Sequence, residues 1–233
     1  MTFVRHAIVA LTLMATAVAF PQIGIGASMA PVSETGQARS PEIRALLEHL
    51  QRHYQETSTL SAKFTQTVTH AGGMTRTRTG TLALRKPGQM RWEFTGEQPE
   101  TIVSDGETIF DYDPGLNQVV ESPLKQAFRT SAAAAFLLGV GNVERDFNAA
   151  APASTPSDDL RYVTLTPKGG GDRIEVGINA NTFDIETLKL EDGLGNTTAL
   201  RFTDTRTNVP LAASLFTFRV PQGADIVGSG GPP

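Results

Sequence analysis

The sequence of 233 residues contains no cysteine. This absence excludes disulfide bonds, thiolate metal sites, a cysteine nucleophile and a lipid-modified N-terminal cysteine. Histidine is also rare, with four residues in the chain. None of them stands near a serine in the sequence context of a nucleophile elbow, and no glycine-rich phosphate loop precedes a helix pattern. The sequence therefore argues against an enzyme, and we expect no catalytic residues, no metal site and no cofactor.

Blocks of basic charge are absent as well. The chain has 20 Lys and Arg against 24 Asp and Glu, which gives a formal net charge of −4. Binding of nucleic acid through a basic stripe is therefore not expected. Hydrophobic residues make up 39% and charged residues 19%, which is typical of a globular domain. Without disulfides, such a domain depends on its apolar core, or on a ligand, for its stability.

An apolar run lies near the N-terminus, where Arg5 precedes residues 7–19. Its length falls short of a membrane span, and a basic residue before a short apolar core is the anatomy of a signal peptide. We expect residues 1–30 to form this signal peptide, with the cleavage site open among positions after Gly26, Ser28 and Ala30, and with a cut after Ala19 as a less favoured option. Residues 31–39 are then expected to be a flexible leader.

A helix is predicted directly after the leader. Ser40 is a good N-cap, Pro41 suits the first helical position, and Glu42 favours the positive helix end. Apolar residues then recur at helical spacing over about four turns. They form one stripe that is suited to covering part of a sheet: Ile43, Leu46, Leu47, Leu50 and Tyr54.

The pattern changes to a period of two from residue 60 onward, which is typical of antiparallel strands with one apolar face. Gly72-Gly73 marks a hairpin between two such strands. Residues 79–121 read as a meander that continues the same alternation. Its large apolar side chains are predicted to share one face: Leu82, Leu84, Met90, Trp92, Phe94, Ile102, Phe110 and Tyr112.

Three turns are predicted between the strands of this meander. Residues 86–89 (Lys-Pro-Gly-Gln) and 113–116 (Asp-Pro-Gly-Leu) place proline and glycine at the two central positions of a type II turn. Residues 104–107 (Ser-Asp-Gly-Glu) offer the Asp-Gly pair of a type I′ hairpin.

The second half of the chain alternates between helical and strand patterns. Residues 123–139 read as one or two helices, 143–147 as a further turn and 149–159 as a loop. The remaining predicted strands are 160–166, 172–179, 182–191, 197–205 and a closing strand at 215–220, followed by a disordered tail at 227–233. This order predicts a mainly β fold with α: a single domain over residues 40–226, with one curved antiparallel sheet and helices across its concave side.

Two short patterns could be mistaken for metal sites. His49 and His53 have the i, i+4 spacing of zinc ligands, but a third ligand is missing, so a solvated helix face is the preferred interpretation. Asp111, Asp113 and Asn117 resemble part of a calcium loop, but the glycine is misplaced and the closing Glu is absent. We interpret them as a hairpin.

The meander also carries a family resemblance. The stretches 85–92 (Arg-Lys-Pro-Gly-Gln-Met-Arg-Trp), 103–106 (Val-Ser-Asp-Gly) and 112–114 (Tyr-Asp-Pro) follow in order, with Phe64-Thr65-Gln66 upstream and Phe216-Thr217-Phe218 downstream. Together they resemble the periplasmic outer-membrane lipoprotein carrier family of the LolA type, from about residue 43 to residue 225. The resemblance implies an incomplete, unclosed antiparallel β-barrel with a helical lid over an apolar cavity.

On pattern alone, the apolar stripe is a plain hydrophobic core. The resemblance implies instead that it lines a cavity for acyl chains. The residues expected there are Phe64, Val68, Leu82, Leu84, Met90, Trp92, Phe94, Ile102, Phe110, Tyr112, Leu124, Phe128, Phe136 and Leu137. Lys86 stands where the family motif has an arginine that reaches backbone carbonyls of the lid. Lysine keeps the charge but loses the bidentate geometry, so Lys86 is the candidate lid latch.

The function implied by the resemblance is that of a periplasmic chaperone. It would take acylated lipoproteins from an ATP-driven release complex of the inner membrane and deliver them to an outer-membrane acceptor, as a monomer without a cofactor. Two alternatives remain open: a periplasmic lipid or lipoprotein sensor of the same fold, and an acyl-ester hydrolase. A Ser–His–acid cluster in a structure would favour the hydrolase.

Overall fold

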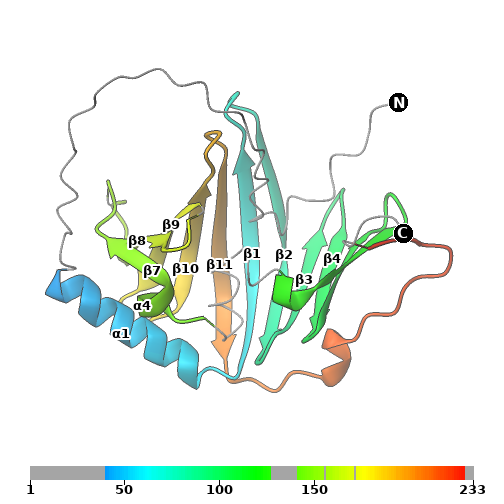
Figure 1. The fold of residues 1–233 in the computed structure, drawn as a ribbon, viewed down its shortest axis with the longest axis horizontal. Helices are drawn as coiled ribbons and strands as arrows, with labels where there is room; N and C mark the ends of the chain where they lie inside the picture. Colours follow the sequence, from blue (N-terminus) through cyan, green and yellow to red (C-terminus); the bar gives the residue numbers. More distant parts are fainter. Residues whose placement is uncertain (1–39, 127–140, 155, 171, 229–233) are drawn as a thin grey trace.

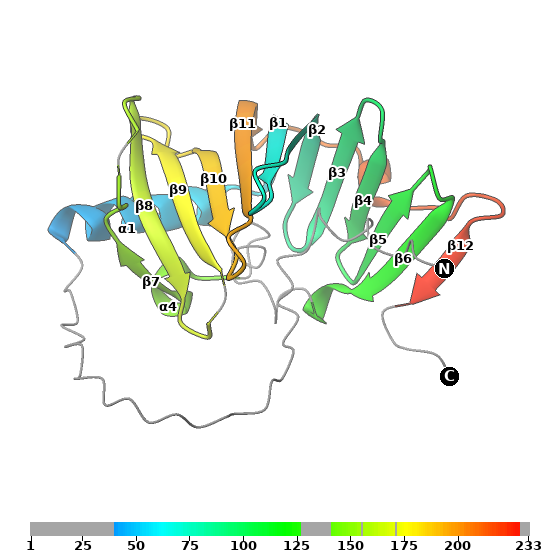
Figure 2. The same ribbon diagram turned by 90° about the horizontal axis from the view of Figure 1, so that it is seen from above.

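The computed structural model describes residues 40–126, 141–154, 156–170 and 172–228. Twelve strands in these residues form one sheet in the order β12-β6-β5-β4-β3-β2-β1-β11-β10-β9-β8-β7 (Figures 1 and 2). The helical elements with described bounds are α1 (Pro41–Glu56), α4 (Val143–Asp146) and the 3-10 turn η1 (Ala213–Phe216), and residues 124–126 are helical as well. The strands are β1 (Thr59–Thr69), β2 (Thr75–Arg85), β3 (Gln89–Thr95), β4 (Glu100–Asp105), β5 (Thr108–Asp113), β6 (Gln118–Pro123), β7 (Phe147–Ala150), β8 (Leu160–Pro167), β9 (Arg173–Asn179), β10 (Ile185–Glu191), β11 (Thr197–Thr207) and β12 (Asp225–Gly228).

The sheet is curved but not closed. Strand β1 joins the two halves because it pairs with β2 on one side and with β11 on the other. Strands β7 and β12 end the order and do not pair with each other, so the barrel is incomplete (Figure 2). This confirms the predicted fold class. One pairing departs from it, since β12 runs parallel to β6.

Helix α1 forms where the sequence predicts it. The Oγ of Ser40 accepts a hydrogen bond from the backbone N–H of Ile43 at 3.3 Å, and Pro41 is the first helical residue. Leu47, Leu50 and Tyr54 are buried. The helix lies against the β7–β11 half of the sheet (Figures 1 and 2). Its apolar stripe therefore covers part of the sheet, as expected.

We call the sheet face that meets α1 the inner face. Strand register defines it in the β1–β5 half, because Leu82 of β2 stands opposite both Ala62 of β1 and Trp92 of β3. The next pairing is Trp92 with Ile102 of β4. One hydrophobic cluster joins the buried residues of this face to those of α1. The core of the inner face is therefore one continuous apolar cluster, part of which α1 covers.

The chain after β11 covers the other, outer face of β3–β5. We predicted a closing strand at 215–220, which is wrong: residues 213–216 form the 3-10 turn η1, and no strand follows until β12. The ring of Phe218 stacks on Phe110 at 5.2 Å, and Phe216 is only 1% exposed. Arg85 contributes by donating to the carbonyl of Leu211. Val227 and Gly228, which we assigned to the tail, are the last residues of β12.

The turns differ from their predictions in detail. Gly88 has φ 77°, as a type II turn requires, and the preceding Lys86–Pro87 bond is cis. In the β5–β6 turn, the residue with positive φ is Asn117 at 47° instead of Gly115, so the type II assignment there is wrong. In the β4–β5 turn only Gly106 has positive φ, which excludes type I′.

Two segments of the second half also need correction or qualification. The predicted turn near 143–147 is confirmed as α4, but the loop expected at 149–159 begins later, since 147–150 form β7. Of the predicted helical segment 123–139, residues 127–139 lie outside the described residues.

Candidate functional site

The inner face of β1–β4 brings together most of the residues predicted to line the cavity. Phe64, Leu82, Met90 and Phe94 are at most 4% exposed. Leu124, at the start of the predicted lid, is 3% exposed, and its side chain lies close to Gly88. The full set on this apolar face is Phe64, Val68, Leu82, Leu84, Met90, Trp92, Phe94, Ile102 and Leu124.

Phe110 and Tyr112 do not belong to this face. Asp111 pairs with Ile102, so its neighbours along β5 point to the outer side of the sheet. There both rings meet Phe218, at centroid distances of 5.2 and 6.1 Å. The prediction that they share a face with Trp92 is therefore wrong. Phe128, Phe136 and Leu137 lie outside the described residues, so their place in the cavity stays a prediction.

Four aromatic rings form a continuous floor on the inner face. Phe64 lies 4.9 Å from Trp92 and 5.0 Å from Phe94, and Trp92 lies 6.2 Å from Phe202. Gly80 makes this possible, because a Cβ at that position would approach the Phe64 ring to 2.6 Å. We call Phe64, Trp92, Phe94 and Phe202 the aromatic floor.

A small void lies between α1 and the sheet. A void lined by Tyr54, Leu60, Ala62, Leu82, Leu84, Ile185, Phe202 and Thr205 measures about 20 Å³. A single water molecule needs about 10–15 Å³ by this measure, so the void has room for about one water. An acyl chain would require α1, or another covering element, to move. Helix α1 therefore packs closely against the sheet around this void.

Lys86 lies at the C-terminal end of α1. Its Nζ donates a hydrogen bond to the carbonyl oxygen of Tyr54, one of the carbonyls that lack an intrahelical partner at a helix end. A cation there also opposes the negative end of the helix dipole. Burial lowers the pKa of Lys86 from its ordinary value. Contact with lid residues 127–139 stays a prediction, whereas the contact with α1 was not anticipated from the sequence.

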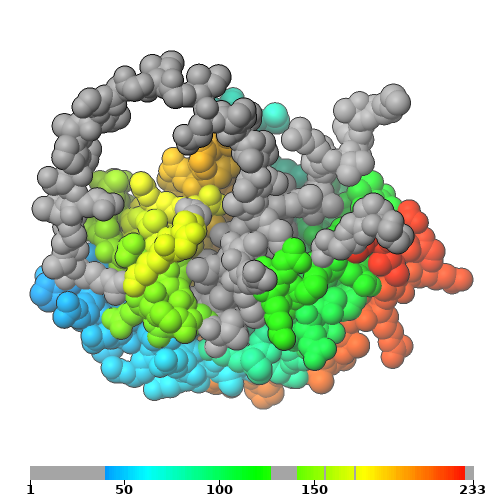
Figure 3. Space-filling model, viewed as in Figure 1, coloured from blue at the N-terminus to red at the C-terminus, as the bar shows by residue number. Residues whose placement is uncertain are grey.

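Several further contacts hold α1 in place. The hydroxyl of Tyr54 accepts from the N–H of Ile185 at 3.1 Å, and the side chain of Gln51 accepts from the N–H of Val143 at 2.9 Å. Figure 3 shows α4 and β7 directly beside α1. Burial raises the pKa of Tyr54 above its ordinary range. The helix is therefore held by hydrogen bonds to both β10 and α4.

Of the two histidines of α1, His49 is exposed, as interpreted from the sequence, whereas His53 is half-buried. His53 Nε2 lies 2.9 Å from Asp184 Oδ1, and the His49 ring stacks on Phe183 at 4.8 Å. Both contacts join α1 to the loop between β9 and β10. Within the described residues, no group of three or more His, Cys, Asp and Glu side chains is placed to hold a metal ion.

Sequence reasoning missed a polar cluster on the inner face, formed by Gln66, Arg78, Glu100 and Asp111. Arg78 donates to Gln66 Oε1 through Nε at 3.3 Å and Nη2 at 3.1 Å, and to Glu100 through Nη1. The guanidinium also lies 3.8 Å above the Phe94 ring. Arg78 shares the parity of Leu82 along β2, so a charge on the apolar face could have been noticed from the alternation.

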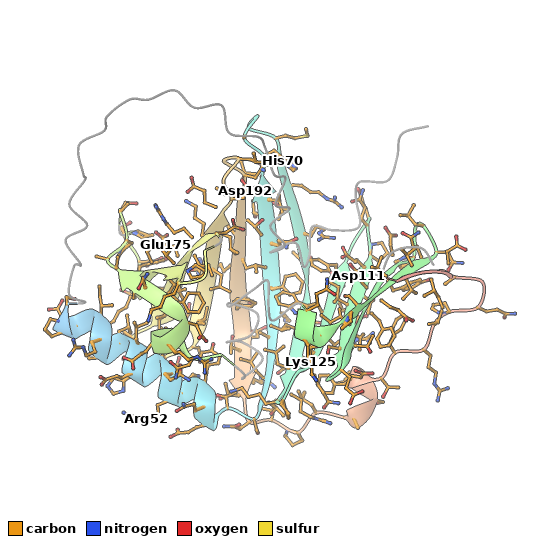
Figure 4. The ribbon with its side chains drawn as sticks, viewed as in Figure 1. Arg52, His70, Asp111, Lys125, Glu175 and Asp192 are labelled. Atoms are coloured by element: carbon orange, nitrogen blue, oxygen red, sulfur yellow. The ribbon has the colours of Figure 1, made fainter. Side chains whose placement is uncertain are left out.

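The electrostatics of this cluster are unusual. Burial, followed by the nearby charge of Glu100, raises the pKa of Asp111 to about 8. Arg78 acts in the opposite direction, but less strongly. Figure 4 places Asp111 on the β5 side of the molecule, far from Arg52 on α1. The inner face thus combines the aromatic floor with one cluster of ionisable side chains, those of Arg78, Glu100 and Asp111.

Comparison with known proteins agrees with this architecture. Residues 55–219 match the family model for the outer membrane lipoprotein carrier protein LolA. The chain belongs to the LolA family. An outer-membrane lipoprotein carrier protein from Cupriavidus necator is 34% identical over 194 residues, which cover 81% of this chain and 90% of that relative.

A LolA-family relative from Chromohalobacter salexigens, also an outer-membrane lipoprotein carrier protein, is 33% identical over 213 residues, 90% of this chain and 97% of the relative. Among solved structures, an uncharacterized conserved protein from Thermus thermophilus aligns with a TM-score of 0.50 at 13% identity, over 80% of this chain and 99% of that one. That likeness concerns the fold alone. No helix in the described ranges is long and apolar enough to cross a bilayer.

Proposed function

We propose that this protein is a periplasmic carrier that binds the acyl chains of lipoproteins released from the inner membrane and delivers them to an acceptor at the outer membrane. The observation that carries this proposal is the aromatic floor on the inner face of an unclosed sheet, with α1 docked against the same face. The LolA-family relatives, which bear the name of outer-membrane lipoprotein carriers, support it.

Release of cargo is the physical difficulty for such a carrier. Burial of one methylene group contributes about 0.8 kcal/mol, so one long acyl chain gains on the order of 10 kcal/mol. An open cavity with that affinity would not let its cargo go. The void beneath α1 that Tyr54 and Phe202 line holds about 20 Å³, so the contacts around it would have to break before a chain could enter there. The cost of opening is subtracted from the net affinity, which makes transfer possible.

We infer that Lys86 sets part of this opening cost. Its hydrogen bond to the Tyr54 carbonyl ties the turn between β2 and β3 to the end of α1. A second void of about 10 Å³ lies beside it, lined by Tyr54, Thr57, Ser58, Thr59, Leu60, Leu84 and Lys86. Loss of this hydrogen bond would free one end of the helix. The predicted lid at 123–139 would act on the same opening.

The other partners follow from the carrier role. The protein would receive cargo from an ATP-driven release complex in the inner membrane and act as a monomer without a cofactor or a chemical reaction of its own. Its export would depend on the signal peptide at residues 1–30. Mature protein is then expected in the osmotic-shock fraction, beginning between residues 20 and 31. Intact Met1 in the membrane pellet would contradict this localisation.

The decisive experiment is to purify the protein from the periplasm and to identify co-purifying molecules by mass spectrometry. A carrier should retain acylated N-terminal peptides of several lipoproteins. Free phospholipid or fatty acid alone would contradict the carrier role and favour lipid sensing. Deacylated peptides that accumulate with time would favour the hydrolase instead.

A further inference from the structure

One carboxylate oxygen of Glu100 has no permanent hydrogen-bond donor. Glu100 is 9% exposed, and its Oε2 accepts from Arg78. Its Oε1 is buried and accepts from no N–H or hydroxyl group of the described residues. The carboxyl group of Asp111 can donate to Glu100 only while it holds a proton. A buried acceptor without a donor is destabilising, and more so when it is charged. This position therefore favours a ligand that brings a donor.

The local charge disfavours an anionic ligand. The polar cluster contains one cation, Arg78, and two carboxyl groups, those of Glu100 and Asp111. Three N–H groups of Arg78 already donate to Gln66 and Glu100, and its guanidinium lies on the Phe94 ring. A phosphate or carboxylate would meet two acidic groups and an arginine that is largely committed. A ligand group that donates hydrogen bonds, whether neutral or cationic, would instead find acceptors in the carboxyl oxygens of Glu100 and Asp111.

The cluster adjoins the aromatic floor directly. Phe94 belongs to the floor, and Arg78 lies 3.8 Å above its ring. Arg78 and Lys86 are eight positions apart along β2 and the turn that follows, which corresponds to about 27 Å at about 3.4 Å per residue. One acyl chain spans half of a bilayer core of about 30 Å, or about 15 Å. An acyl chain can therefore lie on the floor with its polar head at the cluster.

We propose that Glu100 and Asp111 bind the N–H donors at the acylated N-terminus of the cargo, an ammonium or an amide, while the acyl chains lie on the aromatic floor. This inference rests on the proposed function and adds the chemistry by which the polar head is recognised. Arg78 acts as a positioning residue because it donates to Glu100, and Gln66 in turn accepts two hydrogen bonds from Arg78.

The carboxyl groups of Glu100 and Asp111 should also exchange a proton when cargo binds. Because the pKa of Asp111 is raised to about 8, the empty pair holds one proton near neutral pH, and Asp111 can share it with Glu100. The charged groups that face Asp111 are Glu100 of β4, Arg78 of β2 and Asp113 of its own strand. An incoming ammonium would replace this proton, which leaves to solvent. An amide would bind without releasing it.

The test uses synthetic S-diacylglyceryl-cysteinyl peptides with three N-termini: a free ammonium, an N-acetyl amide, and an N-acetyl-N-methyl amide that lacks the donor. Binding is followed by the fluorescence of Trp92, the single tryptophan. We expect at least one donor-bearing peptide to bind about tenfold more tightly than the N-methyl peptide. If the wild type prefers the ammonium peptide and releases a proton on binding, as measured by calorimetry in two buffers, the recognised donor is a free N-terminal ammonium. If it prefers the amide peptide and releases no proton, the recognised donor is the amide N–H of an acylated N-terminus.

The variant Glu100→Gln should reduce a preference for the ammonium to less than about threefold, and Asp111→Asn should abolish proton release. Glu97→Gln, the same change at an exposed carboxylate, is the matched control and should behave as the wild type. Binding of methyl palmitate, which lacks a donor head, reports whether the floor of each variant is intact. Equal binding of all three peptides to the wild type overturns this inference and leaves the carrier role in place. Failure of the wild type to bind any of them refutes the carrier role itself.

Discussion

His53 and Asp184 join α1 to the loop between β9 and β10, with 2.9 Å between Nε2 and Oδ1. His49, one turn earlier, stacks on Phe183, which adopts a φ of 61° that is rare for an aromatic residue. The same loop leads into Ile185, whose N–H binds the Tyr54 hydroxyl. One side of α1 is therefore fixed by this loop, and its C-terminal end by Lys86.

Substitution of His53 by Ala should loosen this side of α1. Both side chains of the His53–Asp184 pair are about one-fifth exposed, at 21% and 19%. Loss of a partly buried hydrogen bond of this kind should lower the free energy of unfolding by about 1 kcal/mol. Urea denaturation measures the change. Arg52→Ala, at an exposed position on the same helix, is the control and should leave the midpoint within error. Equal effects of the two substitutions would mean that the pair does not hold the helix.

Lys86→Leu should weaken closure and favour retention of cargo. The substitution removes the donor to the Tyr54 carbonyl, so opening becomes easier by about 1 kcal/mol, because Lys86 is only half-buried. Cargo is then taken up readily but surrendered poorly, and complexes with lipoprotein should accumulate in the periplasm. Transfer of a labelled lipoprotein from the purified carrier to its acceptor should slow about fivefold.

Lys86→Arg is the conservative control for this effect. Arginine keeps the charge and adds a planar fork of donors, so closure should be equal to the wild type or stronger. Transfer by this variant should therefore not slow. If Lys86→Leu delivers cargo as fast as the wild type, Lys86 is a surface charge that caps α1 and nothing more.

Photo-crosslinkers should separate the two faces of the sheet. A crosslinker at Met90 or Phe94 should capture the acyl chains of a bound lipoprotein, because both residues are buried on the inner face. A crosslinker at Glu93 should not, since alternation turns it outward. Phe110 provides a sharper control, because it is aromatic and lies on the outer face beside Phe218. Labelling at Phe110 equal to that at Phe94 would show that the register or the cavity is misassigned.

The sequence predicts the fold well where local chemistry and periodicity agree. The Ser40–Pro41 cap and the apolar stripe define α1 without help from the rest of the chain. The alternation of Leu82 with Leu84, and of Met90 with Trp92 and Phe94, fixes one inner face for β2 and β3. These patterns depend only on neighbours in sequence, which is why the structure confirms the predictions made from them.

The predictions are wrong where contacts between residues far apart in the sequence decide which face of the sheet a side chain occupies. Phe110 and Tyr112 have the composition of core residues, but their face depends on the pairing of β4 with β5. The segment after β11 provides their partner, Phe218, and this segment has no regular period to predict it. The cluster of Arg78, Glu100 and Asp111 escaped notice for the same reason, since it assembles from three strands.

Relative to the wild type, Asp111→Asn should become increasingly stable as the pH rises from 6 to 8. The pKa of Asp111 is raised from 3.8 to about 8, so between these values the native state holds a proton that the unfolded state has released. The stabilisation from this proton is complete below pH 4 and is lost as the pH rises toward 8. The free energy of unfolding can fall by at most about 1.4 kcal/mol per pH unit, and we expect a fall of about 1–2 kcal/mol between pH 6 and 8, since the group is only partly buried and is coupled to Glu100.

Asparagine has no such dependence, so the wild type should lose stability relative to the variant over this range in urea denaturation. Glu97→Gln, which changes an exposed carboxylate, should follow the wild type at every pH. Parallel curves for the wild type and Asp111→Asn would mean that Asp111 is already ionised at pH 6, and that the carboxyl pair holds no proton for a cargo ammonium to displace.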